Sequence, residues 1–100
     1  MAIAAEATFH GPGATMANYF VSLEKLGATP EGPHPDPGCL FHWVTELPGN
    51  AGLLVTDVWK TKEQFEKFIA EKVGPVAKEV GLPQPQIKFI DVGNYCTAGS

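Results

Sequence analysis

The sequence predicts an α+β fold of ferredoxin-like type, with elements in the order βαββαβ and a four-stranded antiparallel sheet in the order 4-1-3-2. Three patterns predict it: an alternating segment near the N-terminus, a hairpin signal at mid-chain, and two apolar helical stripes that each follow a capping threonine. Both helices are expected on one face of the sheet. Residues 1–96 are expected to form a single domain and residues 97–100 a flexible tail.

The first strand and the first helix follow from their periodicities. Residues 3–9 alternate between an apolar side and a mixed side, which is the period of two typical of a strand. After a Gly-Pro-Gly break, Thr15 is placed to cap a helix, and Gly27 is placed to end it. The apolar positions of this helix recur at helical spacing. They are Met16, Tyr19, Phe20, Leu23 and Leu26.

Residues 28–38 carry four prolines and no periodic pattern, which predicts a semi-rigid loop. Loops of this length inside a compact domain are often functional. Its one histidine, His34, is expected either to be solvated or to belong to a lid.

Residues 39–59 predict a β-hairpin with Pro48-Gly49-Asn50 at its turn. A loop of two or four residues gives one register, in which His42 faces Asp57 and Leu40 faces Trp59. A loop of three or five residues would instead move each pair to opposite faces.

Both faces of this hairpin carry apolar side chains, whereas a half-exposed antiparallel pair should alternate between apolar and polar. Helices of the same chain can cover only one face. For a short chain, a second copy of itself is the simplest cover for the other face. The hairpin therefore predicts a homodimer.

The second helix is expected to start at Thr61, because residues 61–64 satisfy the capping-box pattern. Gly74-Pro75 is expected to interrupt it, with a short helical continuation up to Val80. Residues 86–95 are expected to form the last strand. The predicted buried stripe of the helix consists of Phe65, Phe68, Ile69 and Val73.

The composition argues against several functions. The net charge is −4 and the chain has no arginine, so neither nucleic acid nor an anionic membrane surface is an expected partner. No apolar run reaches the roughly 18 residues of a membrane span, and no signal peptide is indicated. A cytoplasmic location is expected, and Cys39 and Cys96 are too isolated to imply a disulfide framework. Cys39 and His42 have the spacing of metal ligands, but that offset on a strand predicts opposite faces, so no metal site is expected.

The join between the hairpin and the second helix carries a family resemblance. Val58-Trp59-Lys60-Thr61, with Glu63 and Phe65, resembles the tryptophan–x–Ser/Thr–x–Glu–x–Phe join of the antibiotic-biosynthesis-monooxygenase-like branch of the dimeric α/β-barrel superfamily. The resemblance implies a dimer whose two sheets pack into an α/β barrel, with an apolar pocket between sheet and helices in each subunit.

Activities in that superfamily include cofactor-free oxygenation of polycyclic phenols, haem breakdown, lactone isomerisation and polyketide cyclisation. Phe68 and Val73 stand where many members carry histidines. The chain also lacks the first-strand asparagine and the second-helix tryptophan of the haem-degrading members. Haem breakdown is therefore not expected.

His42 and Asp57 are the best candidates for acid–base chemistry, because a carboxylate beside an imidazole fixes its tautomer and raises its basicity. The competing interpretation is a structural hydrogen-bonded pair. Glu6 could enter the same pocket as an acid, or could instead pair with a lysine at the barrel rim.

Tyr95 is a further candidate, as a hydrogen-bond donor or acid at the end of the last strand, beside Asn94 as an amide that binds an oxyanion. Packing at a dimer rim would explain Tyr95 equally. Four aromatic residues could line the pocket or simply fill the core: Tyr19, Phe20, Trp59 and Phe68.

The sequence thus predicts an enzyme that acts without a cofactor on an aromatic or polyketide-like molecule, by oxygenation, cyclisation or isomerisation. His42 and Asp57 would form its acid–base pair. The alternative is a dimeric protein without catalytic activity, which binds a small hydrophobic ligand or has a purely structural role.

Overall fold

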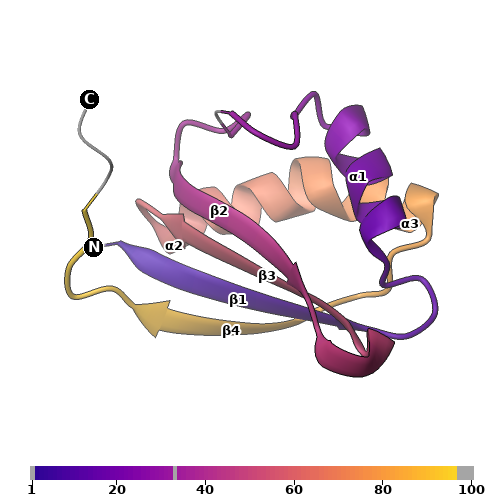
Figure 1. Cartoon of the computed structure of the whole chain (residues 1–100). Coiled ribbons are helices and arrows are strands. Elements are labelled where there is room, and N and C mark those ends of the chain that lie inside the picture. The colour runs from indigo at the N-terminus through magenta and orange to yellow at the C-terminus, as the bar shows by residue number, and fades with distance from the viewer. Residues whose placement is uncertain (1, 33, 97–100) are drawn as a thin grey trace.

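The computed structural model describes residues 2–32 and 34–96, so the expected tail at 97–100 lies outside the described residues. Four strands form one antiparallel sheet in the order β2-β3-β1-β4, which confirms the predicted order 4-1-3-2. The helices pack on the same side of this sheet (Figure 1). The elements are β1 (Ile3–His10), α1 (Met16–Lys25), β2 (Cys39–Glu46), a 3₁₀ turn (Pro48–Asn50), β3 (Gly52–Trp59), α2 (Lys62–Phe68), a π-helical segment (Ile69–Val73), α3 (Gly74–Val80) and β4 (Gln86–Asp91).

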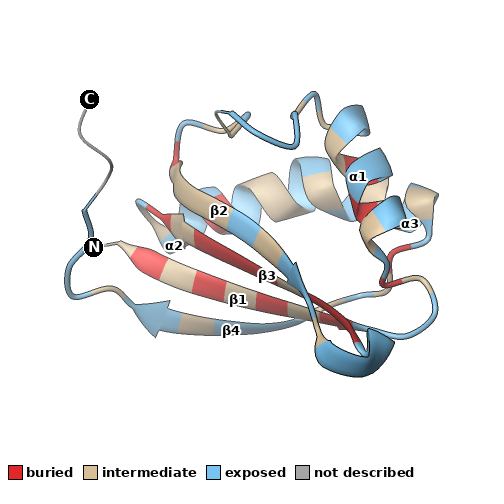
Figure 2. Cartoon of the chain, viewed as in Figure 1, coloured by how far each residue is buried: buried red, intermediate tan, exposed pale blue. Residues whose placement is uncertain are grey.

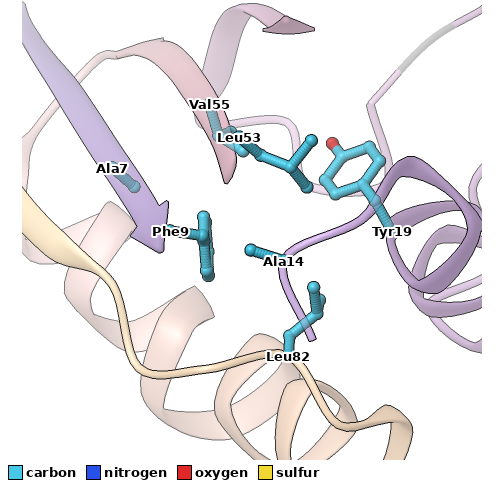
Figure 3. Close-up of a cluster of buried hydrophobic side chains, with 7 residues drawn as sticks. All are labelled: Ala7, Phe9, Ala14, Tyr19, Leu53, Val55 and Leu82. Atoms are coloured by element: carbon cyan, nitrogen blue, oxygen red, sulfur yellow. The ribbon is translucent and has the colours of Figure 1, made fainter. Parts of the chain in front are cut away.

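Strand β1 is an inner strand of the sheet, and its side chains alternate between the two faces of the sheet. Alternate residues from Ile3 to Phe9 are buried beneath the helices, while those between them are half exposed (Figure 2). One core cluster surrounds Trp59 and Phe65. The other joins β1 and β3 to α1 and the segment before β4 (Figure 3). It contains Ala7, Phe9, Ala14, Tyr19, Leu53, Val55 and Leu82.

Helix α1 begins and ends where its capping residues predict. The Thr15 hydroxyl accepts a hydrogen bond from the Asn18 amide at 3.2 Å. At the other end Gly27 has a φ of 77°, and the Ala28 amide donates to the Leu23 carbonyl at 2.9 Å. This pairing is the helix-ending arrangement that glycine permits. It fixes the direction in which the proline-rich loop leaves the helix.

The hairpin turn is the four-residue alternative. The Leu47 amide donates to the Gly52 carbonyl at 2.8 Å, and Gly49 and Asn50 adopt φ values of 70° and 58°. Gly52 itself has a φ of 138°, and a Cβ there would collide with the carbonyl of Phe9. Glycine at this position therefore lets β3 approach β1 closely at the start of the strand.

The predicted pairing of His42 with Asp57 is confirmed. The predicted pairing of Leu40 with Trp59 is wrong, because a β-bulge between Cys39 and Phe41 places Cys39 opposite Trp59 instead. The extra residue turns Cys39 toward the helices, where it packs against the Trp59 cluster. The expectation that Cys39 and His42 lie on opposite faces is therefore wrong too.

The second helical region also differs from its prediction. Gly74 keeps helical angles (φ −54°, ψ −52°), so Gly74 and Pro75 do not interrupt the helix. The π-helical segment widens the preceding turn, and the Gly74 amide donates to the Ile69 carbonyl five residues earlier. This wider turn accommodates Pro75, whose ring would collide with a carbonyl in a regular α-helix. The region ends at Gly81, with a φ of 84°.

The sheet face opposite the helices is not covered by any described element. The strand registers place Trp43, Thr56, Glu6 and Lys88 in one row across this face, and Phe41, Val58, Ala4 and Ile90 in the next row. We call these eight residues the open sheet face. Trp43 is 49% exposed and Ile90 44% exposed there, so large apolar side chains lie on this surface of the isolated chain.

Candidate functional site

A cavity of about 860 Å³ lies between the helix-facing side of the sheet, helix α1, the proline-rich loop and the α2–α3 region. Apolar side chains from all these elements line it, including Phe20, Leu23, Phe68 and Ile87. Its polar side chains include Tyr19, His34, His42 and Asp57, which come from four different segments of the chain. A largely apolar hollow with a few convergent polar groups is the usual form of a small-molecule site.

The centre of the site is a hydrogen-bonded chain of three side chains. His42 Nδ1 lies 2.5 Å from Asp57 Oδ1, and the Tyr19 hydroxyl bonds to His42 Nε2. With a neutral ring protonated at Nδ1, the imidazole donates a hydrogen bond to the carboxylate, and Nε2 accepts a hydrogen bond from the phenol. The second Asp57 oxygen accepts from Trp59 Nε1 at 3.2 Å. The carboxylate is thus held on both sides.

The fold explains why these groups meet. His42 and Asp57 are directly opposed on β2 and β3, and their side chains retain only 25% and 10% exposure. Tyr19 reaches them from α1, where it is among the buried residues of that helix. Figure 3 shows Tyr19 on its helix, facing the strand residues Leu53 and Val55. The sheet therefore supplies the imidazole and the carboxylate, and the helix supplies the phenol.

The Tyr19 phenol and the Cys39 thiol at this site both stay protonated at neutral pH. Burial raises the pKa of Tyr19, and the negative charge of the Asp57 carboxylate raises it further. Burial also raises the pKa of Cys39 to about 12, with the Asp57 carboxylate as the second cause. Tyr19 is consequently a hydrogen-bond donor, and Cys39 is a thiol without the thiolate character of a reactive cysteine.

His34 is a site residue for which the sequence left two alternatives open, a solvated side chain or a part of a lid. It is half buried, with its ring centroid 5.0 Å from Phe68, 5.4 Å from Trp59 and 5.6 Å from His42. The expectation of a solvated side chain is therefore wrong; His34 belongs to the loop wall of the cavity. Burial and the neighbouring His42 lower its pKa. The sequence signal was the proline-rich loop, whose one histidine, His34, was offered as a lid residue without a contact to the other site residues.

Four of the predicted pocket residues lie at the site, in two different roles. Tyr19, Phe20 and Phe68 line the cavity. Phe20 is 46% exposed, so the predicted apolar stripe of α1 is buried around Tyr19 and reaches the surface at Phe20. Trp59 has 0% exposure. It donates a hydrogen bond to Asp57 and does not face the cavity.

Glu6 does not join the site. Its neighbours across the sheet are Thr56 and Lys88, while the adjacent residue Ala5 pairs with Asp57. Because successive strand residues point to opposite faces, Glu6 lies on the open sheet face and not in the cavity. The expectation that Glu6 could enter the pocket is wrong. Glu6 is opposite Lys88 in the strand register, but the two side chains form no ion pair among the described residues.

Asn94 and Tyr95 also lie apart from the site. The predicted last strand was too long: β4 ends at Asp91, so both residues follow the strand and are exposed. The Tyr95 ring packs edge-on against Phe41 at 6.3 Å, and Phe41 belongs to the open sheet face. The structure does not bring either residue to His42.

Neither a candidate metal cluster nor a helix able to span a membrane is present among the described residues. Residues 2–32 and 34–96 contain no group of three or more His, Cys, Asp or Glu side chains that could hold a metal ion. None of the described helices combines the length and the apolar character needed to cross a bilayer.

Comparison with known proteins supports the fold. No family model matches the chain, and no curated protein matches it. Solved structures do match over almost the whole length. A protein from Caulobacter crescentus, named provisionally as an antibiotic biosynthesis monooxygenase, is 18% identical, with a TM-score of 0.68 and coverage of 93% of this chain and 91% of that one.

Two other matches have named properties. SnoaB from Streptomyces nogalater, described as a cofactor-independent oxygenase, is 15% identical, with a TM-score of 0.57 and coverage of 94% and 93%. MhuD, solved with two manganese protoporphyrin IX molecules per active site, is 13% identical, with a TM-score of 0.61 and coverage of 98% and 100%. The chain thus has the ferredoxin-like fold of proteins named as antibiotic biosynthesis monooxygenases, as the join at Trp59 predicted.

Proposed function

We propose that the chain is an enzyme that removes a proton from a small aromatic or polyketide-like molecule held in the cavity, without a cofactor. The observation that supports this most is the Asp57–His42–Tyr19 chain at the wall of the cavity. Oxygenation by dioxygen, cyclisation and isomerisation of such molecules can each start with this proton transfer. The likeness of fold to a cofactor-independent oxygenase agrees with the proposal.

His42 would be the general base. Its Nδ1–H is fixed on Asp57, which keeps the Nε2 lone pair directed away from the sheet and stabilises the imidazolium that forms. A bound substrate would replace Tyr19 at Nε2 and transfer its proton there. The roles of Asp57 and Trp59 would then be to hold the imidazole in one tautomer and one orientation.

Tyr19 would be the acid or hydrogen-bond donor, a role for which the sequence indicated Glu6 and Tyr95. Once the substrate occupies Nε2, the Tyr19 hydroxyl is free to donate to the substrate oxygen on which negative charge develops. The raised pKa of Tyr19 suits this role, because the phenol stays protonated and keeps its proton available for donation.

The active form would be a homodimer, with the open sheet face as its interface. That face carries Trp43, Ile90 and Phe41, which lie exposed or half exposed in the isolated chain. The second copy would cover apolar surface that water otherwise contacts, which is the main driving force of protein association.

The test is turnover of a panel of hydroxylated naphthalenes and anthracenes in air, followed by mass spectrometry of the product mixture. We expect His42→Gln to lower turnover by roughly 100-fold or more, as the loss of a general base does. His10→Gln is the matched control, because His10 is exposed at the end of β1 and bonds only to the Ala51 carbonyl among the described residues. Its turnover should equal that of the wild type.

Equal turnover in the wild type and in His42→Gln would contradict the proposal. Binding of panel members without any turnover would favour the alternative, a dimeric protein that sequesters a hydrophobic ligand. A requirement for added haemin, seen as turnover only with the porphyrin present, would contradict the cofactor-free part.

A further inference from the structure

The hydrogen-bonding groups of the cavity are not all used within the protein. Both nitrogens of His42 are engaged, one by Asp57 and the other by Tyr19. His34 differs, because its Nδ1 is bonded to its own loop while Nε2, on the other side of the ring, has no partner among the described residues. His34 is therefore the imidazole at this cavity with a nitrogen free for a ligand.

The tautomer of His34 follows from its loop contacts. The Asp36 amide donates to His34 Nδ1 at 2.9 Å, so that nitrogen carries a lone pair and the proton of the neutral ring is on Nε2. The longer contact of 3.3 Å between Nδ1 and the Asp36 carbonyl would need the opposite tautomer. Burial, which lowers the pKa of His34, keeps the ring neutral at pH 7.

The ring is fixed before any ligand enters. Asp36 holds the loop through its carboxylate, which accepts from the Gly38 amide at 2.7 Å, and through its carbonyl, which accepts from the Cys39 amide at 3.1 Å. Trp59 and Phe68 pack against the imidazole. A donor that is already in place loses little conformational entropy when a ligand binds.

The charge at the cavity restricts what this donor can bind. Glu31, Asp36 and Asp57 line the cavity, and none of the lysines does so. A carboxylate ligand would meet these negative charges without a cation to compensate, whereas a neutral carbonyl oxygen would not.

We infer that His34 is a specificity-determining residue, whose Nε2–H donates to a neutral carbonyl oxygen of the ligand while the ionisable O–H or C–H of the same ligand lies at His42. The substrate class is then a planar aromatic molecule with an uncharged carbonyl in addition to its acidic proton. This inference rests on the proposed function, because it uses the same cavity and the same base.

Three naphthols that differ in one substituent test the inference by fluorescence titration at pH 7. 6-Acetyl-2-naphthol has the carbonyl, 6-ethyl-2-naphthol has the same two-carbon chain with a methylene in place of the carbonyl, and 6-hydroxy-2-naphthoic acid has a charged group at this position. For the wild type we expect the acetyl compound to bind about fivefold more tightly than the ethyl compound, as one neutral hydrogen bond provides. The carboxylate should bind most weakly.

Two variants remove the donor in different ways. His34→Phe keeps aromatic packing against Trp59 and Phe68 but has no N–H, and His34→Asn keeps an acceptor for the Asp36 amide but cannot place a donor at Nε2. In both variants the acetyl and ethyl compounds should bind equally, with the affinity for the ethyl compound within about twofold of the wild type. Circular dichroism melting curves report whether each variant is folded, and either variant alone decides the result.

A preference for the acetyl compound that persists in either variant, once that variant is shown to be folded, would overturn the inference and leave the proposed function standing. Tightest binding by the carboxylate would overturn the proposed substrate class. If none of the naphthols binds the wild type at millimolar concentration, the proposed function fails and the inference fails with it.

Discussion

His42 Nδ1 lies 2.5 Å from Asp57 Oδ1, and the two residues face each other across β2 and β3. The four-residue turn at the hairpin sets this register, and the β-bulge after Cys39 lies beyond the pair and does not disturb it. A local feature of the chain thus brings the imidazole and the carboxylate together at the cavity, and most of the predictions below depend on contacts around this pair.

Replacing Asp57 by Asn should destabilise the protein. The Trp59 indole and the His42 imidazole both donate to the carboxylate, and an amide offers only one acceptor oxygen to them. One buried donor then loses its partner, at a cost of about 1–3 kcal/mol in the free energy of unfolding. Urea denaturation at pH 7 measures it. Asp91→Asn, at the exposed end of β4, is the control and should change stability by less than about 0.5 kcal/mol; equal effects of the two would show that the Asp57 contacts contribute nothing.

Replacing Tyr19 by Phe should separate stability from catalysis. The ring keeps its packing in the core, and the lost hydrogen bond to His42 costs about 0.5–1.5 kcal/mol of stability. Turnover should fall by roughly 100-fold if the hydroxyl stabilises developing charge.

The matched control for that change is Tyr95→Phe. The Tyr95 ring lies against Phe41, and Tyr95 itself is not among the residues that line the cavity. Steady-state kinetics should therefore show wild-type turnover for it. Loss of turnover in Tyr95→Phe but not in Tyr19→Phe would reassign the donor.

The open sheet face is the expected dimer interface, so a charged side chain introduced there should disrupt the dimer. Light scattering at micromolar concentration should give a mass near twice 10.7 kDa for the wild type. Trp43→Lys should give a mass near 10.7 kDa, because the change removes a large apolar side chain from the interface and burying a further ammonium there costs its hydration. Val21→Lys, which changes an exposed apolar residue of α1, should remain a dimer. A wild type that is monomeric would contradict the predicted dimer.

His34 should make stability depend on pH. Its folded-state pKa lies below the ordinary value of 6.5, so the unfolded chain binds more protons at acidic pH. The contribution of His34 to stability is therefore fully present above pH 6.5 and is lost as the pH falls from there toward the folded-state pKa. Urea denaturation at pH 8 and pH 5 should show a larger loss for the wild type than for His34→Phe. Equal losses would mean that His34 titrates normally in the folded protein.

Much of the fold was predictable because its signals are local. Thr15 and Thr61 each accept the amide three residues later, as their positions before apolar stripes predicted. The turn residues Gly49 and Asn50 adopt left-handed angles, as the hairpin signal implied. Such features depend on a few adjacent residues, whose preferred dihedral angles and hydrogen bonds the sequence specifies directly.

The errors have a common origin in longer-range geometry. The bulge at Leu40 inserts a residue that simple alternation does not reveal, and the π-helical segment accommodates Pro75 in a way that a rule about proline does not include. The face on which Glu6 lies relative to Asp57 depends on how β1 pairs with β3, two strands far apart in the chain.

The sequence by itself determined the order of the elements, the caps of both helices and the pairing of His42 with Asp57, since each is encoded within one short segment. Only the tertiary structure decided which side chains surround that pair. Tyr19 reaches His42 from 23 residues away because packing sets the rotation of α1 against the sheet, and His34 reaches it because the loop closes over Trp59 and Phe68. These contacts arise from the simultaneous burial of apolar surface across separate elements, which no local pattern of residues records.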